Sequence, residues 1–204
     1  MVSLTLFCTA IAYLLGSIST AVIVSKLMGK GDIRKAGSGN AGTTNTLRVL
    51  GKKAAIFVAL GDFLKGILAV VIAKLLFNFF KIEGDVLTVC CFASIAVVLG
   101  HVYPIYFGFK GGKGIMTSFA TVIMLDWEIA VILIVLFIVI VASTKYVSLG
   151  SCIAGLMYPV LVLMFHQDKP VFIAISVFLC ALVVYCHRAN IKRLARGTES
   201  KIKF

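Results

Sequence analysis

Charged side chains are scarce in this sequence. Only 14% of the 204 residues are Asp, Glu, Lys or Arg, whereas 61% are hydrophobic, and the mean hydropathy is +1.08. A typical soluble domain has about 25% charged residues, so the composition excludes this class. The apolar runs are continuous and lack the alternation of membrane-spanning strands, which also excludes a membrane β-barrel.

Several motifs that carry chemistry are missing. The six cysteines lie in apolar segments without a CxxC pair, so we expect small hydrophobic helix residues and no metal or disulfide framework. No His or carboxylate pair has the spacing of metal ligands. The segment from Gly108 to Lys113 is one residue short of a Walker A motif, and Gly114 stands where Ser or Thr is required. Ser38 lacks the GxSxG setting of a hydrolase nucleophile.

Long apolar runs fill most of the chain. A run of about 20 residues crosses a hydrocarbon core of about 30 Å as a helix. We therefore expect an all-α, polytopic integral membrane bundle with about seven transmembrane helices, in one domain over residues 1–204. The expected spans are 4–25, 54–77, 86–107, 115–125, 129–143, 147–165 and 171–185. The run 115–125 is short for a full crossing, so it must tilt, borrow preceding residues or remain partly inside the bundle.

Basic residues collect in alternate connectors between these runs. The first, third and fifth connectors and the C-terminal tail are basic, whereas the even connectors hold only Lys81 and Lys169 as cations. Cytoplasmic loops of membrane proteins carry the excess of Lys and Arg. This predicts an external N-terminus, a cytoplasmic C-terminus and polar motifs that all face the cytoplasm. The net charge of +12 is thereby explained without a nucleic-acid partner.

Residues 31–48, which we call the polar segment, interrupt the apolar sequence after the first span. Its glycines allow tight turns that direct several N–H groups into one concavity, an arrangement that binds anions. Arg34, Lys35 and Arg48 add positive charge, and arginine can hold a phosphate with two parallel hydrogen bonds. Short polar side chains come from Ser38, Asn40, Thr44 and Asn45. The pattern favours an anion site over an ordinary solvated loop.

Two further polar clusters follow on the predicted cytoplasmic side. The turn from Gly111 to Gly114 opens a helix, where unpaired N–H groups and the helix dipole favour an anion, and Lys113 adds a charge. His187 and Asn190 have the i, i+3 spacing of one helix face. The histidine is a candidate general base or phosphate donor. The simpler alternatives are a plain turn and a polar helix end.

Asp62, Lys65 and His101 are ionisable residues within the predicted spans. Asp62 and Lys65 have the spacing of an ion pair on one helix face, and ionisable groups at such depth need a partner or a wet cavity. The pair is either purely structural or supports a site. His101, shortly before Pro104, either stabilises the interrupted helix or lines the site.

Taken together, these motifs resemble the bacterial acyl-phosphate:glycerol-3-phosphate acyltransferase family. The matching stretches are Asp32-Ile33-Arg34, Gly37-Ser38-Gly39-Asn40, Thr44-Asn45, Arg48, Gly51, Gly100-His101, Tyr103-Pro104, Phe109 to Gly114, Tyr146-Val147-Ser148-Leu149, His187-Arg188, Asn190-Ile191, Arg193-Leu194, Gly197 and Glu199. The resemblance implies a seven-helix enzyme of the bacterial cytoplasmic (inner) membrane with its active site on the cytoplasmic side. Such an enzyme makes lysophosphatidic acid, the first acylation product of phospholipid synthesis. Thr43 departs from the alanine that is usual there.

The resemblance also implies roles for individual residues. It implies catalytic roles for Ser38, Arg48, His187 and Asn190 and a structural role for Glu199. From their spacing alone, we also expect Asp62 and Lys65 to be structural. It associates Gly111, Gly112 and Lys113 with the phosphate of glycerol 3-phosphate. We add Gly39, Asn40, Thr44, Asn45 and Ser148 as candidates for substrate and phosphate binding. The implied partners are acyl phosphate, glycerol 3-phosphate and membrane lipids.

The implied reaction needs neither ATP, a metal nor another cofactor, because an acyl phosphate is an activated mixed anhydride. The proton of the attacking hydroxyl goes either to His187 or to a phosphate oxygen of the substrate, and we favour the second. The competing hypothesis is a small multi-span transporter of phosphorylated metabolites. Against it, transporter sites lie near the membrane midplane between repeats, whereas the polar motifs here gather on one side and no internal repeat is visible.

Overall fold

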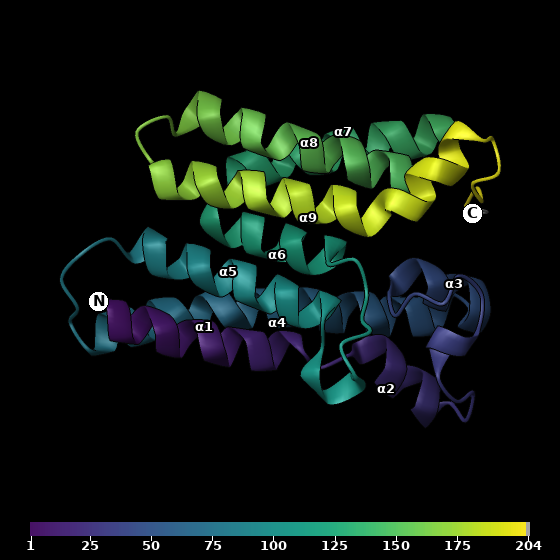
Figure 1. The fold of residues 1–204 in the computed structure, drawn as a ribbon, viewed down its shortest axis with the longest axis horizontal. Coiled ribbons are helices and arrows are strands. Elements are labelled where there is room, and N and C mark those ends of the chain that lie inside the picture. The colour runs from purple at the N-terminus through teal and green to yellow at the C-terminus, as the bar shows by residue number, and fades with distance from the viewer. Residues whose placement is uncertain (203–204) are drawn as a thin grey trace. The chain divides into compact units, whose positions relative to one another are not determined.

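The computed structural model describes residues 1–202 and is built from helices, with no strand in this range (Figure 1). The elements are α1 (Val2–Gly16), α2 (Thr20–Leu27), η1 (Ile33–Lys35), α3 (Thr43–Leu50), α4 (Lys52–Phe79), α5 (Val86–Val102), η2 (Ile105–Phe107), α6 (Ile115–Leu125), α7 (Trp127–Thr144), α8 (Val147–Phe165) and α9 (Pro170–Ala195). Contacts group them into two compact units, the first ending at Leu125 and the second beginning at Asp126. That the two units form one domain stays a prediction.

Within the described residues, six helical segments are long and apolar enough to cross a membrane. They are Val2–Leu27, Lys52–Phe79, Val86–Phe107, Trp127–Thr144, Val147–Phe165 and Pro170–Ala195. The predicted class, an all-α multi-span membrane protein, is confirmed. The apolar helix α6 has only 11 residues, about 16 Å at 1.5 Å per residue, which is about half of a hydrocarbon core. A count of seven crossings and the orientation of the termini therefore stay predictions.

The first expected span is broken into two helices. Residues 17–19 separate α1 from α2, and the Lys65 ammonium donates to the Ile18 carbonyl across 2.9 Å at this break. Glycines allow α1 to pack backbone to backbone on α5. A Cβ on Gly16 would lie 2.1 Å from the Val97 carbonyl oxygen, and one on Gly100 would lie 2.2 Å from that of Tyr13. Small residues thus bring these helices together, as in other membrane bundles.

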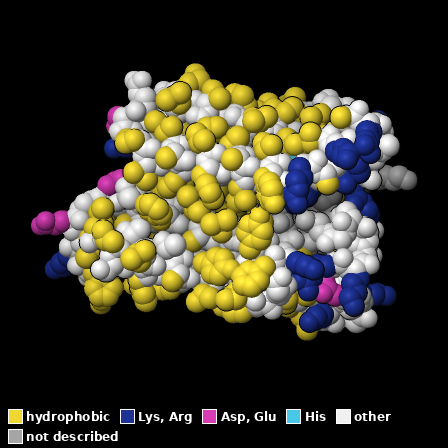
Figure 2. All heavy atoms as spheres, in the orientation of Figure 1, with side chains coloured by type: hydrophobic (Ala, Val, Ile, Leu, Met, Phe, Trp, Pro, Cys, Tyr) yellow, Lys and Arg dark blue, Asp and Glu magenta, His cyan; other side chains and the backbone are white. Residues whose placement is uncertain are grey.

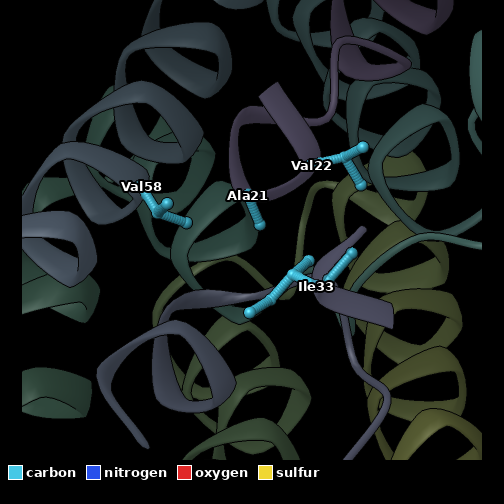
Figure 3. Packing of buried hydrophobic residues seen from close by; sticks show 5 residues of the cluster. Ala21, Val22, Ile33 and Val58 are labelled. Carbon is cyan, nitrogen blue, oxygen red and sulfur yellow. The ribbon is translucent and has the colours of Figure 1, made fainter. Parts of the chain in front are cut away.

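The polar segment contains a helix of its own and is anchored by a small apolar core. The sequence pattern predicts no helix in this connector, but residues 43–50 form α3, which is followed by Gly51 with φ of 83° before α4 begins. Figure 3 shows the buried side chains that fix the segment to α2 and α4. They are Ala21, Val22, Ile33, Ala41 and Val58. Because burying an isoleucine side chain is worth about 2 kcal/mol, Ile33 fixes the segment firmly.

Hydrogen bonds between separate segments fix both ends of the second unit. Asp126 caps the start of α7 by accepting from the Ile129 amide at 3.0 Å, and it also pairs with His166 after α8. At the other end, Gly197 (φ 68°) terminates α9. The chain then turns back, so that the Ile202 amide donates to the Lys145 carbonyl at 2.9 Å. The C-terminal residues are thereby brought to the connector between α7 and α8.

Candidate active site

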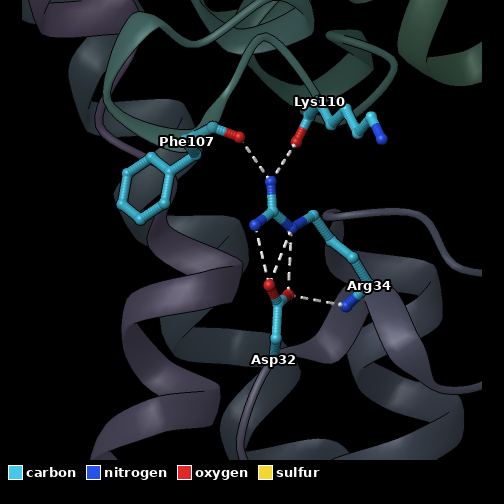
Figure 4. Close-up of polar contacts among 4 residues, drawn as sticks. All are labelled: Asp32, Arg34, Phe107 and Lys110. Carbon is cyan, nitrogen blue, oxygen red and sulfur yellow. Dashed lines mark hydrogen bonds and ion pairs between the residues drawn. The ribbon is translucent and has the colours of Figure 1, made fainter.

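The polar segment is joined to the loop of residues 108–114, which we call the glycine loop, by one arginine. Arg34 Nε donates to both carboxylate oxygens of Asp32, at 3.0 and 3.1 Å, and Nη2 to one of them at 2.7 Å. Its Nη1 donates to the carbonyls of Phe107 and Lys110, at 2.6 and 3.0 Å (Figure 4). Hydrogen bonding to Arg34 lowers the pKa of Asp32 to about 2. We call this arrangement the arginine clasp; it uses Arg34 to hold backbone, not to grip a phosphate.

Asn45 fixes the turn that presents Ser38. Its Nδ2 donates to the carbonyls of Ile33 and Ala36, at 3.3 and 3.0 Å, and its Oδ1 accepts from the Ser38 amide at 2.8 Å. Gly37, which lies between Ala36 and Ser38, has φ of 60°, and a Cβ there would lie 2.2 Å from Asn45 Oδ1. The buried Asn45 amide is thus bonded to loop backbone, which places the exposed Ser38 in a defined position.

The other predicted residues of the polar segment surround this turn. Gly39, Thr44 and Arg48 are exposed and Asn40 is half-buried. Thr44 lies in the first turn of α3 and Arg48 in the last, and their i, i+4 spacing puts them on one face of the helix. Thr43, the departure from the family pattern, begins α3 and is half-buried. The exposed side chains are placed so that a ligand can reach them.

Gly111 and Gly112 pack directly on the end of α5. The Gly111 amide donates to the Val102 carbonyl and the Gly112 amide to that of His101, both at 3.1 Å. A Cβ on Gly111 would lie 1.9 Å from the His101 carbonyl oxygen. These two N–H groups are therefore bonded to backbone, and glycine is needed here because any side chain would clash. That Gly111 and Gly112 help to bind phosphate stays a prediction.

The anion-binding potential of the glycine loop lies at the start of α6 instead. This helix begins at Ile115, directly after Gly114, and the first N–H groups of a helix have no acceptor within it. The helix dipole adds a partial positive charge at this end. Lys113 is half-buried beside it. In the first unit the structure thus brings together the polar segment and the glycine loop, since a Cβ on Gly112 would also lie 2.9 Å from the Ala41 carbonyl oxygen.

In the second unit, Glu199 collects side chains from two helices. One carboxylate oxygen accepts from Ser148 Oγ at 2.7 Å and from Asn190 Nδ2 at 2.6 Å, and the other accepts from Arg193 Nε at 2.6 Å. Burial raises the pKa of Glu199, but these hydrogen bonds outweigh it and hold the pKa below the ordinary value. We call this the glutamate clasp. It joins two predicted site residues, Ser148 and Asn190, through the residue predicted to be structural.

His187 lies on α9, one turn before Asn190 and buried. Its Nδ1 lies 2.8 Å from the Val183 carbonyl oxygen. Because a carbonyl only accepts, this hydrogen bond places the proton of a neutral imidazole on Nδ1 and the lone pair on Nε2. The side chain is thus held in the tautomer in which Nε2 can accept a proton.

The predicted pair of Asp62 and Lys65 is confirmed, with 2.9 Å between Lys65 Nζ and Asp62 Oδ1. The structure adds His101, whose Nδ1 lies 3.4 Å from the same oxygen. Sequence reasoning left His101 without a partner, because no spacing rule connects α4 with the end of α5. Over residues 1–202, no group of three or more His, Cys, Asp or Glu is arranged to hold a metal ion.

Known proteins resemble this chain over nearly its whole length. The family model described as glycerol-3-phosphate acyltransferase matches residues 6–197. The glycerol-3-phosphate acyltransferase of Clostridioides difficile strain 630 is 46% identical over 192 residues, covering 94% of this chain and 92% of that protein. The protein of the same name from Thermoanaerobacter pseudethanolicus is 45% identical over 192 residues, with the same coverage.

Two solved structures of PlsY (YgiH), described as an integral membrane glycerol 3-phosphate acyltransferase, share the fold. The glycerol 3-phosphate form has a TM-score of 0.87 and 37% identity, covering 98% of this chain and 96% of that one. The lysophosphatidic acid form has a TM-score of 0.84 and 37% identity, covering 98% and 95%. With the sequence matches, these likenesses show that this chain belongs to the glycerol-3-phosphate acyltransferase family.

Proposed function

We propose that this protein transfers a fatty acyl group from acyl phosphate to the 1-hydroxyl of glycerol 3-phosphate, releasing lysophosphatidic acid and inorganic phosphate. The observation that carries the proposal is the likeness to the glycerol 3-phosphate form of PlsY, at 37% identity over 98% of the chain. The second solved form is named for lysophosphatidic acid, the expected product. No observation favours the transporter hypothesis, since the family and the relatives above are acyltransferases.

The donor is inferred from the chemistry of the site residues. An acyl phosphate is an activated anhydride, so the enzyme mainly positions two substrates and stabilises the departing phosphate. Lys113 and Arg48 supply fixed positive charge for this anion. The substrate hydroxyl oxygen bonds to the acyl carbon as the bond from that carbon to the phosphate oxygen breaks. The released phosphate takes the electron pair.

The proton of the attacking hydroxyl has two possible acceptors, a phosphate oxygen of the substrate and His187 Nε2. We favour the phosphate oxygen. The tautomer set by Val183 would nevertheless let His187 accept the proton, or accept a hydrogen bond from the hydroxyl. His187→Ala distinguishes the two: a maximum rate within about threefold of the wild type contradicts an obligatory base, whose removal lowers rates by about 100-fold or more.

Phosphate recognition in glycerol 3-phosphate is assigned to the start of α6. The N-terminal amides of α6, its dipole and the ammonium of Lys113 together form the usual elements of a phosphate site. Ser38, Thr44 and Arg48 extend the polar surface of the same unit, and Gly39 and Asn40 shape the turn around them. The arginine clasp supports this assignment because it fixes the polar segment against the glycine loop.

The protein is a multi-pass membrane protein, and we assign it to the bacterial cytoplasmic membrane with its site on the cytoplasmic side. Figure 2 supports this orientation for the first unit: Lys and Arg gather at the end that carries α2 and α3, whereas acidic side chains lie mostly at the opposite end of the visible face. An excess of cations marks the cytoplasmic side of membrane proteins.

The function is tested with purified protein in lipid, supplied with acyl phosphate and glycerol 3-phosphate, following phosphate release and lysophosphatidic acid together. We expect equal amounts of both products, lost in Ser38→Ala and Arg48→Ala but retained in the control Ser143→Ala, which replaces an exposed serine of α7. Activity with acyl-CoA and none with acyl phosphate would contradict the donor. No product from folded protein with either donor would contradict the enzyme, and transport would then be assayed in sealed vesicles.

A further inference from the structure

Three ionisable side chains are buried together beneath the glycine loop. Asp62, Lys65 and His101, which we call the buried triad, expose 2%, 4% and 7% of their surface. Lys65 Nζ and His101 Nδ1 lie 2.9 and 3.4 Å from the same oxygen of Asp62. Burying such groups is expensive, and an apolar cluster of equal volume is often as stable. A purely stabilising role therefore explains the triad poorly.

The triad holds elements from across the first unit. Lys65 Nζ donates to the Ile18 carbonyl at the break between α1 and α2, at 2.9 Å, and Thr20 Oγ1 donates to Asp62 Oδ1 at 3.2 Å. From the other side, Thr117 Oγ1 in the first turn of α6 donates to the Asp62 carbonyl at 3.1 Å. Asp62 thus also fixes the start of α6, through its backbone carbonyl.

His101 connects the triad to the glycine loop. Its carbonyl accepts the Gly112 amide at 3.1 Å, and its ring lies against the same residue, because a Cβ on Gly112 would be 2.1 Å from His101 Nε2. The ring therefore stands between the Asp62 carboxylate and the loop backbone. A movement of the ring would displace Gly112 and the adjoining Lys113.

We propose that the buried triad positions the glycine loop and the start of α6 for the phosphate of glycerol 3-phosphate, with His101 as the positioning residue between Asp62 and Gly112. This inference rests on the proposed function of the loop. His101 does not touch the substrate in this role; it sets where the Lys113 ammonium and the amides of α6 lie. An error of about 1 Å in such groups lowers rates by about 100-fold.

His101 is the member to change, because removal of Asp62 or Lys65 would leave an unpaired buried charge and unfold the protein for an unrelated reason. His101→Ala is expected to raise the KM for glycerol 3-phosphate about tenfold or more, with the KM for acyl phosphate within about twofold of wild type. His101→Asn retains a donor toward Asp62 and should recover part of the loss. The matched control is His166→Ala, which also removes a histidine paired with an aspartate and should leave both KM values unchanged.

A double-mutant cycle separates positioning from general stability. Gly112→Ala pushes on the same ring from the loop side, so its effect on the KM should combine with that of His101→Ala to less than the product of the two. Multiplicative effects, or equal changes in both KM values, would overturn the proposal.

Stabilisation of the protein against heat by glycerol 3-phosphate alone provides a readout without catalysis. The proposal requires the shift in unfolding temperature to shrink in His101→Ala and to persist in His166→Ala. A wild-type shift without product formation would contradict the proposed function and leave this test intact. An equal shift in His101→Ala and wild type, or product formation by a wild type that shows no shift, would overturn the positioning role. Neither product nor shift in wild type would overturn both proposals.

Discussion

The two units each use one charged side chain to hold their functional residues, but the held groups differ. In the first unit, Arg34 donates to the carbonyls of Phe107 and Lys110 and is neutralised by Asp32, two residues away. In the second unit, Glu199 accepts from the side chains of Ser148 and Asn190. The arginine clasp therefore sets the path of the backbone, whereas the glutamate clasp sets the orientation of two site side chains.

This difference decides how each region tolerates change. A carbonyl is present whatever the residue, so the arginine clasp depends on Asp32 and Arg34 but little on the side chains at 107 and 110. In the glutamate clasp each hydrogen bond joins two side chains, so that bond is lost when either of its two residues changes. Loss of the glutamate clasp should therefore act directly on Ser148 and Asn190, whereas loss of the arginine clasp should act on the site only through the position of the glycine loop.

Among changes to the two clasps, the largest effect is expected for Glu199→Ala. It removes three hydrogen bonds to a carboxylate, each worth about 1.5–3 kcal/mol at most, and releases both Ser148 and Asn190. We expect a loss of about 3 kcal/mol in the free energy of unfolding and a fall in the maximum rate of about 100-fold. Thermal unfolding and product formation measure the two effects.

Glu199→Gln sharpens this test, because it keeps the shape and one acceptor oxygen and should give an intermediate loss. The control is Glu83→Ala, which removes an exposed acid from the loop before α5 and should change neither quantity. A fully active Glu199→Ala enzyme would mean that Ser148 and Asn190 need no fixed orientation.

A smaller effect is expected for Arg34→Lys. Lysine keeps the charge but lacks the planar fork that reaches Asp32 and two carbonyls together. We expect a loss of about 2 kcal/mol in stability and a rise of about tenfold in the KM for glycerol 3-phosphate, with a nearly unchanged maximum rate. Steady-state kinetics decides this, with Lys30→Ala as an exposed control on the same connector.

An equal fall of the maximum rate in Arg34→Lys and Glu199→Ala would abolish the distinction between a clasp that holds backbone and one that holds side chains. A split into a KM effect for Arg34 and a rate effect for Glu199 is what the structure requires.

Patterns within one element could be read from the sequence. The apolar runs indicated the membrane helices, and the i, i+3 spacing of Asp62 and Lys65 indicated their ion pair, because helix geometry fixes both. The break at residues 17–19 and the helix α3 were missed. Both depend on partners far along the chain, such as Lys65 at the break and the apolar core around Ile33.

The site shows the same limit. The residues of the polar segment and the glycine loop were recognisable as motifs, but their geometry was not. Gly111, for example, packs on the end of α5, and such a close approach of two backbones leaves no trace in the local sequence. The contact between Ser148 and Glu199 joins residues 51 positions apart, so no pattern of spacing could reveal it.

The smallest effect concerns the pH dependence of stability, to which the carboxylates of both clasps contribute. The pKa of Asp32 is lowered to about 2, chiefly by hydrogen bonding to Arg34, and that of Glu199 is also lowered. A carboxyl with a lowered pKa in the folded state stabilises the protein above its unfolded pKa, near 4. That stability is lost as the pH falls toward the folded pKa. We therefore expect the unfolding temperature to be flat above about pH 5 and to decrease below about pH 4.

Asp32→Asn should remove the part of this decrease that belongs to the arginine clasp. That part corresponds to about 1 kcal/mol in the free energy of unfolding, after allowance for solvent screening of a partly exposed pair. The same variant should lower stability at neutral pH by a similar amount. Glu199→Gln should remove the other part, beginning at a pH near the unfolded value for glutamate, about 4.3. Because the clasps share no residue, the two changes should add in the double variant. Unfolding temperatures of Asp32→Asn that equal those of the wild type between pH 4 and pH 2 would contradict this prediction. They would show that Arg34 holds the glycine loop without help from the Asp32 charge.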